Sequence, residues 1–230
     1  MKKVKFILFS ALIACGLFLS APFAGFAQVV APPPVSLNAT SDADQLKKAS
    51  EWAASLKLDD AAKEARVKQV ILTHLITIRD WHNSHPFSTV PAGINPVTGQ
   101  PLSDLDRQVI ANSAMPKNVH QDLMAGLRKD LTEQQVNLVL DKYTVGKVAF
   151  TMSAYRVIVP NLTPIEDSTI NRLMVQAREQ AVDYKNMNQI SAIFEIYKTK
   201  AEQFLNSNGR NWREMYRDYT NKIKAEKAKK

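Results

Sequence analysis

The chain has 230 residues, with 30 Lys and Arg against 22 Asp and Glu, a net charge of +8 and a single cysteine. This length suits one domain or two small ones, and one cysteine cannot form an internal disulfide. The sequence contains no Gly-rich phosphate loop, Gly-x-Ser-x-Gly elbow or His-Glu-x-x-His motif. Their absence argues against nucleotide binding, serine hydrolysis and zinc proteolysis.

Residues 1–27 have the order of a cleaved signal peptide. Three lysines precede an apolar run over residues 6–23, and small residues follow it. A proline and a glycine interrupt the run near its end, whereas a spanning helix needs about 20 predominantly apolar residues. We therefore expect cleavage between Ala27 and Gln28 and an exported protein, periplasmic or secreted, without a transmembrane segment in the mature chain.

A competing interpretation concerns Cys15. Leu12-Ile13-Ala14-Cys15 resembles a lipobox, which would make Cys15 the lipidated first residue of a bacterial lipoprotein. The apolar run continues past Cys15, whereas such a tether is usually polar, so we favour cleavage after Ala27 and keep lipidation at Cys15 as the alternative. Cleavage after Ala27 removes the cysteine and three lysines and lowers the net charge from +8 to +5. That charge permits an anionic partner without requiring one.

Residues 28–41 contain three consecutive prolines among Ser, Thr and Asn, which is typical of a flexible leader. A helical domain is expected over residues 42–222, with a basic tail at 223–230. In this domain apolar residues recur every three or four positions, and no alternating strand pattern competes with them. The first helix is expected at about 42–56, and Asp59 is expected to cap a long second helix.

Residues 86–102 form the one long loop predicted in the domain, because four prolines and two glycines interrupt any regular element there. Loops of this length are uncommon in compact domains and are either functional or mobile. After the loop, Ser103 and Asp106 have the spacing of a cap for a third helix. Pro116 is expected to divide that helix.

Two threonines mark further helix starts. Thr132 with Gln135, and Thr163 with Glu166, have the spacing of a capping box, in which each side chain bonds the backbone N–H of the other residue. They predict helices at about 133–143 and 164–184. A short helix is expected between them, at about 147–159.

Apolar stripes in the last 40 residues predict two more helices, which Gly209 separates. Antiparallel packing is expected where the connections are short. The predicted fold is therefore all-α: a single helical-bundle-like domain of seven or eight helices that follows the signal peptide and the Pro-rich leader.

Several motifs between residues 131 and 209 resemble a known family. In chain order they are Leu131-Thr132-Glu133-Gln134-Gln135-Val136, Val139-x-Asp141, Thr144, Gly146, Tyr155, Pro160-x-Leu162-Thr163, Ala177-Arg178-Glu179-x-Ala181-x-Asp183, and Tyr197-Lys198-x-Lys200 through Leu205 to Gly209. Their combined order resembles a family of secreted Gram-negative proteins, catalogued as a domain of unknown function and often encoded beside polysaccharide-utilisation genes.

This resemblance covers about residues 42–220 and implies an exported helical protein that works near plant or algal polysaccharides. It carries over no catalytic residue. The chain departs from the family pattern at Lys200, where arginine is usual, and at Glu202-Gln203, where two asparagines are usual. If these polar positions form a site, its chemistry differs in this chain.

The Leu-Thr-x-x-Gln motif at residues 131–135 also occurs in small helical periplasmic chaperones that hold unfolded clients. By itself the motif is little more than a capping box. A basic, cysteine-free mature chain is compatible with such a chaperone, but the long loop and the C-terminal aromatic stripe fit it less well.

His82 and His85 are the candidate metal ligands. Their spacing of three residues on a helix could direct two imidazoles to one ion, but a third ligand would have to come from a distant carboxylate. Alternatively, the two histidines interact with the negative end of the helix dipole. We predict no metal site and no cofactor, and keep His82 and His85 as the residues to examine.

Four acidic residues are the candidate catalytic groups: Asp80, Asp141, Glu179 and Asp183. Glu179 and Asp183 lie four residues apart on one helix face and could share acid and base roles in glycoside cleavage. Two residues of a single helix seldom flank a sugar at the required separation, so a salt-bridged or solvated face is the alternative interpretation.

A cationic set could bind an anionic oligosaccharide, because arginine forms bidentate bonds with carboxylates and lysine supplies a point charge. Its candidate residues are Tyr143, Arg178, Lys198 and Lys200. Ordinary surface charges would have the same composition.

Three functional hypotheses remain. In the first, the protein is a binding or accessory module for polysaccharide utilisation, with an anionic oligosaccharide or a periplasmic protein as partner. In the second, it is a carbohydrate-active enzyme that uses helix-borne carboxylates, and in the third a chaperone-like protein. Nucleic acid is not an expected partner.

Overall fold

The computed structural model describes residues 37–96 and 98–228, which form nine α-helices, one short 3₁₀ helix and no β-strand. The elements are α1 (Leu37–Ala54), α2 (Ala61–Ser84), η1 (Phe87–Thr89), α3 (Asp104–Ser113), α4 (Lys117–Asp130), α5 (Glu133–Tyr143), α6 (Lys147–Ile158), α7 (Pro164–Ala181), α8 (Met187–Ser207) and α9 (Trp212–Ala228). The predicted all-α class is confirmed. In this part of the chain, no helix has both the length and the apolar character needed to cross a bilayer.

The structure has more helices than the seven or eight expected, because Pro116 separates α3 and α4 completely and serves as the N-cap of α4. A proline fits such a boundary, since it has no N–H to donate to a preceding turn. The predicted signal peptide, with Cys15, lies outside the described residues. Helix α1 begins at Leu37, five residues before the expected start of the domain.

Helix starts follow from local side-chain chemistry. Capping boxes at Ser103, Thr132 and Thr163 are all present, as their spacing predicted. The cap of α2 is Asp60 and not Asp59 as predicted. Asp60 has extended backbone geometry, and its carboxylate accepts hydrogen bonds from the next turn at 2.7 and 3.1 Å, as an N-cap requires.

Helix α7 ends at Ala181, three residues earlier than predicted. The Val182 N–H still bonds the carbonyl of Arg178, but the Tyr184 N–H bonds the carbonyl of Ala181 in a tighter turn. Asn186 then caps α8 with its side-chain oxygen. This early end places Asp183 in the turn between α7 and α8, beyond the last residue of the helix on which it was predicted.

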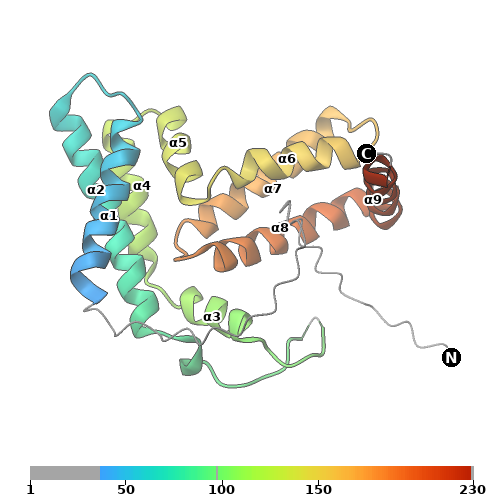
Figure 1. The fold of residues 1–230 in the computed structure, drawn as a ribbon, viewed down its shortest axis with the longest axis horizontal. Coiled ribbons are helices and arrows are strands. Elements are labelled where there is room, and N and C mark those ends of the chain that lie inside the picture. Colours follow the sequence, from blue (N-terminus) through green and yellow to red (C-terminus); the bar gives the residue numbers. More distant parts are fainter. Residues whose placement is uncertain (1–36, 97, 229–230) are drawn as a thin grey trace.

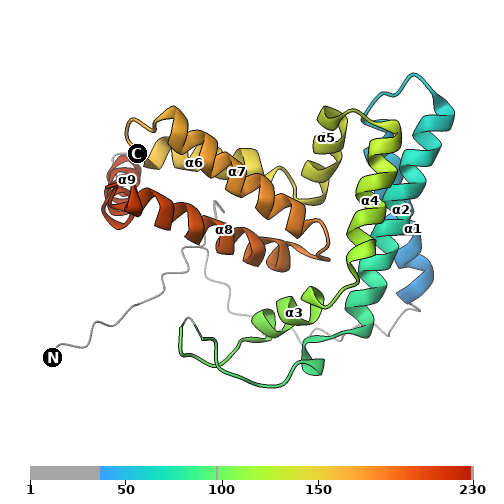
Figure 2. The ribbon, with the colours of Figure 1, turned by 180° about the vertical axis from the view of Figure 1, so that it is seen from behind.

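The helices form two layers, each with its own apolar core. Figure 1 shows α1, α2 and α4 side by side in one layer, and α6, α7 and α8 in a second layer that runs across the first. Figure 2 shows the same arrangement from behind, with α5 between the two layers and α3 below α8. The two layers meet where the end of α7 approaches α2, α4 and α5.

The first core is built from α1, α2, α4 and α5. Its fully buried side chains include Val67, Ile71, Leu127, Val139 and Leu140. Each fully buried aliphatic side chain of this kind contributes about 1.5–3 kcal/mol relative to an exposed one. Val182, which follows α7, also belongs to this core, so the second layer is anchored to the first by apolar contact.

The second core lies between α6, α7 and α8. Tyr155, Ile170, Met174, Phe194 and Leu205 are buried there. Helix α9 covers the far end of this core through Trp212, which packs against Tyr155 with ring centroids 5.2 Å apart.

The predicted loop after α2 is held against α3. Arg107 donates two hydrogen bonds to the carbonyl oxygen of Val90, at 2.9 and 2.6 Å. Its guanidinium also lies over the ring of Phe87, 5.3 Å from the centroid. Ile94 and Pro101 form an isolated antiparallel bridge across the loop.

Gly126 sets the closest approach of α4 to α2, because a Cβ at this position would lie 2.7 and 2.8 Å from the two methyl carbons of Val70. We expect Gly126→Ala to lower the free energy of unfolding by about 1–2 kcal/mol through overpacking. Gly126→Ala should lower stability even though alanine is more stable than glycine in an exposed helix by about 1 kcal/mol. Urea denaturation measures the difference.

The matched test is the same substitution in a Val70→Ala background. There the steric conflict is absent, so Gly126→Ala should stabilise the protein relative to Val70→Ala alone. An equal loss in both backgrounds would show that the contact with Val70 is not the reason for glycine.

Candidate functional site

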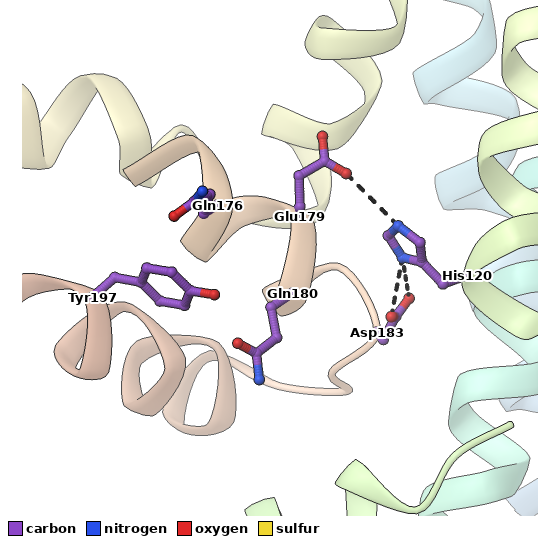
Figure 3. Close-up of a pocket in the computed structure, with 6 residues that line it drawn as sticks. All are labelled: His120, Gln176, Glu179, Gln180, Asp183 and Tyr197. Carbon is purple, nitrogen blue, oxygen red and sulfur yellow. Dashed lines mark hydrogen bonds and ion pairs between the residues drawn. The ribbon is translucent and has the colours of Figure 1, made fainter. Parts of the chain in front are cut away.

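The candidate site is centred on His120, in the first turns of α4, and Asp183, in the turn after α7. The Nδ1 atom of His120 lies 3.2 and 3.1 Å from the two carboxylate oxygens of Asp183. Figure 3 shows this pair at the edge of a cavity beside α7. The imidazole is thereby oriented by the carboxylate, with Nε2 on its far side.

Asp183, which follows α7 in the second layer, has a second histidine partner in the first layer. Its Oδ1 atom lies 3.1 Å from Nε2 of His74 in α2, and Nδ1 of His74 lies 3.2 Å from the hydroxyl of Tyr143. With its proton on Nε2, His74 donates to Asp183 and accepts from Tyr143, which satisfies both ring nitrogens. The network therefore joins α2, α4, α5 and the α7–α8 turn.

The charges of this network reinforce one another. Burial raises the pKa of the Asp183 carboxyl, but hydrogen bonds from His120 and His74 outweigh burial and bring the pKa below its ordinary value. The hydrogen bond to Asp183 in turn raises the pKa of His120. Each group therefore favours the charged form of the other.

A shallow cavity of about 480 Å³, largely open to solvent, lies beside the pair. Its lining residues, drawn in Figure 3, are His120, Gln176, Glu179, Gln180, Asp183 and Tyr197. Glu179 Oε2 lies 3.7 Å from Nε2 of His120, which is too long for a hydrogen bond. The cavity combines two carboxylates, an imidazole, two amides and a phenol, so it can both donate to and accept from a polar ligand.

The structure brings together only two of the four acids predicted as catalytic candidates. Glu179 and Asp183 line the cavity. Asp141 instead pairs with Arg178 at 2.8 Å, and Asp80 is an exposed residue paired with Arg79 at 2.8 Å.

The predicted cationic set does not converge. The side chain of Arg178 is 5% exposed and is held by Asp141 and Asn137 between α7 and α5. Lys198 pairs with Glu195 on its own helix, and the ammonium of Lys200 lies 4.2 Å from the ring centroid of Tyr197. Tyr143 is buried and bonds His74.

His82 and His85 point to different surroundings. The ring of His85 stacks on Trp81, with centroids 3.7 Å apart. His82 is buried near Tyr184, and burial, reinforced by the charge of Lys185, lowers its pKa to about 4. In the described residues, no group of three or more His, Cys, Asp or Glu side chains is arranged to hold a metal ion.

Sequence reasoning did not identify His120, Gln176, Gln180 or Tyr197 as site residues. His120 lies 63 residues before Asp183, on a different helix, so no local spacing relates the two. The available signal was indirect: Glu179, Asp183 and Tyr197 all stand in the motifs that carried the family resemblance, whereas Gln176 and Gln180 are only their neighbours in sequence.

The family model described as "Protein of unknown function (DUF3826)" matches residues 43–225. The chain belongs to the DUF3826 family. This match confirms the domain-of-unknown-function family that the motifs indicated. None of the curated proteins matches the chain. The DUF3826 match spans both helical layers and every residue that lines the cavity, so the site belongs to the family domain.

We expect Asp183→Asn to lower the free energy of unfolding by about 3 kcal/mol at pH 6, because it removes the charge that partners the His120 imidazolium and the buried His74. Urea denaturation measures the loss. Asp80→Asn is the matched control, since Asp80 pairs only at the surface, and it should change stability by about 0.5 kcal/mol or less. Equal losses in both variants would contradict a special role for Asp183.

The size of this difference should depend on pH. The contribution of Asp183, whose pKa is lowered, is present above its unfolded value near 3.8 and is lost as the pH falls through the folded value. The contribution of His120, whose pKa is raised, is complete below 6.5 and is lost as the pH rises through the folded value. The gap between wild type and Asp183→Asn should therefore be largest between about pH 4 and 6.5 and shrink as the pH rises through the folded pKa of His120.

Proposed function

We propose that this DUF3826 protein is an exported accessory protein of polysaccharide utilisation that binds oligosaccharides in the cavity beside His120. The observation that carries the proposal is the composition of the cavity wall, in which each lining residue contributes a polar group beside apolar side-chain carbons. Its volume lies within the range of about 300–1,000 Å³ that is usual for small-molecule sites, but it is open to solvent and richer in polar side chains than most of them.

Sugar hydroxyls donate and accept hydrogen bonds at once, and the cavity offers groups suited to both. The 3.7 Å separation between Glu179 Oε2 and His120 Nε2 leaves the imidazole N–H and the carboxylate oxygen unbonded to each other. A hydroxyl that bridges the two atoms from the cavity side can accept from His120 through its oxygen and donate its proton to Glu179. Gln176 and Gln180 each add one amide acceptor and two donors.

The protonation of Asp183 does not suit the acid role in glycoside cleavage. A glycosidase needs a carboxylic acid whose pKa is raised, so that it can protonate the departing oxygen. Asp183 has the opposite shift, because His120 and His74 hold it as a carboxylate. Its role is to fix the imidazole of His120 at the cavity edge.

Binding is tested by titration calorimetry of the purified full-length protein against a panel of neutral and acidic plant oligosaccharides, with chromatography of the mixtures to detect products. We expect binding without product release. Gln176→Ala should weaken binding about three- to tenfold, because it removes a cavity amide. Gln134→Ala, at an exposed position of α5, is the matched control and should leave affinity unchanged.

Two results would overturn this proposal. If no oligosaccharide of the panel binds, oligosaccharides are excluded as the ligand. If Gln176→Ala and Gln134→Ala change the affinity equally, the cavity is excluded as the binding site. Product release that depends on Glu179 would instead support the carbohydrate-active enzyme.

Export is the second part of the proposal, and it rests on the order of charged, apolar and small residues in positions 1–27. Expressed in a Gram-negative host, the protein should be recovered from the periplasm or medium with Gln28 as its first residue, as read by mass spectrometry. A lipid-modified chain that begins at Cys15 would establish the alternative. An intact Met1 in the cytoplasm would contradict export altogether.

A further inference from the structure

A second cavity, of about 380 Å³, adjoins the first at the junction of α3 and α4. Three residues line both cavities: His120, Gln180 and Asp183. The two cavities are therefore neighbouring compartments that meet at His120. Each is large enough for a small ligand, and a linear ligand can occupy both only if it passes this residue.

The two compartments differ in charge. Glu179 lines only the first cavity, whereas Lys117 lines only the second. The shared Asp183 is already balanced by His120 and His74. The first cavity therefore carries an excess of negative charge and the second an excess of positive charge when His120 is protonated.

The backbone of α4 adds to the positive character of the second cavity. Lys117 is the first residue of α4, and Pro116, its N-cap, makes no side-chain hydrogen bond to the helix. The first N–H groups of a helix carry the positive end of its dipole. Lys117 and the helix terminus thus act on the same compartment.

Asn112 is a second, independent feature of this compartment. It lines the cavity and is only 4% exposed. Its side-chain oxygen accepts from Gln108 at 3.2 Å, but in the described residues its amide nitrogen has no hydrogen-bond partner. Buried donors are rarely left unpaired in proteins, and the Asn112 side chain also interacts with the buried His82 behind the cavity wall.

We infer that the ligand is an acidic oligosaccharide of at least two units, with a carboxylate-bearing sugar in the second cavity and an uncharged sugar in the first. This inference rests on the proposed function and adds the class of ligand and its orientation. Lys117 pairs with the sugar carboxylate, His120 contacts both units near their linkage, and Glu179 accepts from hydroxyls of the uncharged unit. The cation that recognises the acid is thus Lys117, from a segment outside the predicted cationic set.

The test compares four probes by titration calorimetry on the full-length protein at pH 6 and low salt: an aldobiouronic acid, its methyl ester, the corresponding neutral disaccharide and the free uronic acid. We expect the acid to bind about three- to tenfold more tightly than the ester. Lys117→Gln should abolish this preference, whereas Lys117→Arg should retain it. Lys129→Gln, at an exposed position near the other end of α4, is the matched control and should behave as wild type.

The outcomes separate the inference from the proposed function. Equal affinities for acid and ester, or a preference that survives Lys117→Gln, would overturn the acidic subsite while the neutral disaccharide still binds. A free uronic acid that binds as tightly as the disaccharide would overturn the two-unit span. No binding of any probe would overturn the proposed function together with the inference.

Discussion

The carboxylate of Asp183, shared by two imidazoles, is the interaction on which the junction of this protein depends. His74 reaches it from α2 and His120 from α4, while Asp183 itself follows α7. A charge in this position would be costly if it were unpaired, because burial penalises it. The two histidines reverse that penalty and keep the pKa of Asp183 low. The polar network and the apolar anchor at Val182 together hold the two layers against each other.

The cavity is a consequence of this junction. Two apolar cores that cross at an angle cannot fill the space between them with hydrophobic side chains alone, and here the remaining space is lined by polar groups of α4, α7 and α8. Other charged side chains are already paired within the protein. Arg178 links α7 to α5 through Asp141, and Lys198 pairs with Glu195 on α8. The groups left for a ligand are those that face the two cavities, and their charges differ from one compartment to the other.

Prediction from sequence succeeded where the deciding interactions are local. Capping boxes join residues three positions apart, so Thr132 and Thr163 mark the starts of α5 and α7 without knowledge of the fold. It was wrong where two neighbouring residues could serve equally, as for Asp59 and Asp60, and where a helix ended early, as at Ala181. Two of the four predicted acids, Glu179 and Asp183, line the cavity, and they belong to one sequence motif. None of the predicted cations lines it.

The sequence by itself determined the helical class, most helix boundaries and the family, since apolar periodicity, capping and motif order are properties of short segments. Only the tertiary structure decided the site. His120, Asp183 and His74 are separated by 63 and 109 positions in the chain, and their convergence depends on how two helical layers cross. Side-chain partners decided the rest. Arg178 and Lys198, two of the predicted cationic candidates, form ion pairs with Asp141 and Glu195, because burial and proximity, which sequence spacing does not encode, determine which charges remain free.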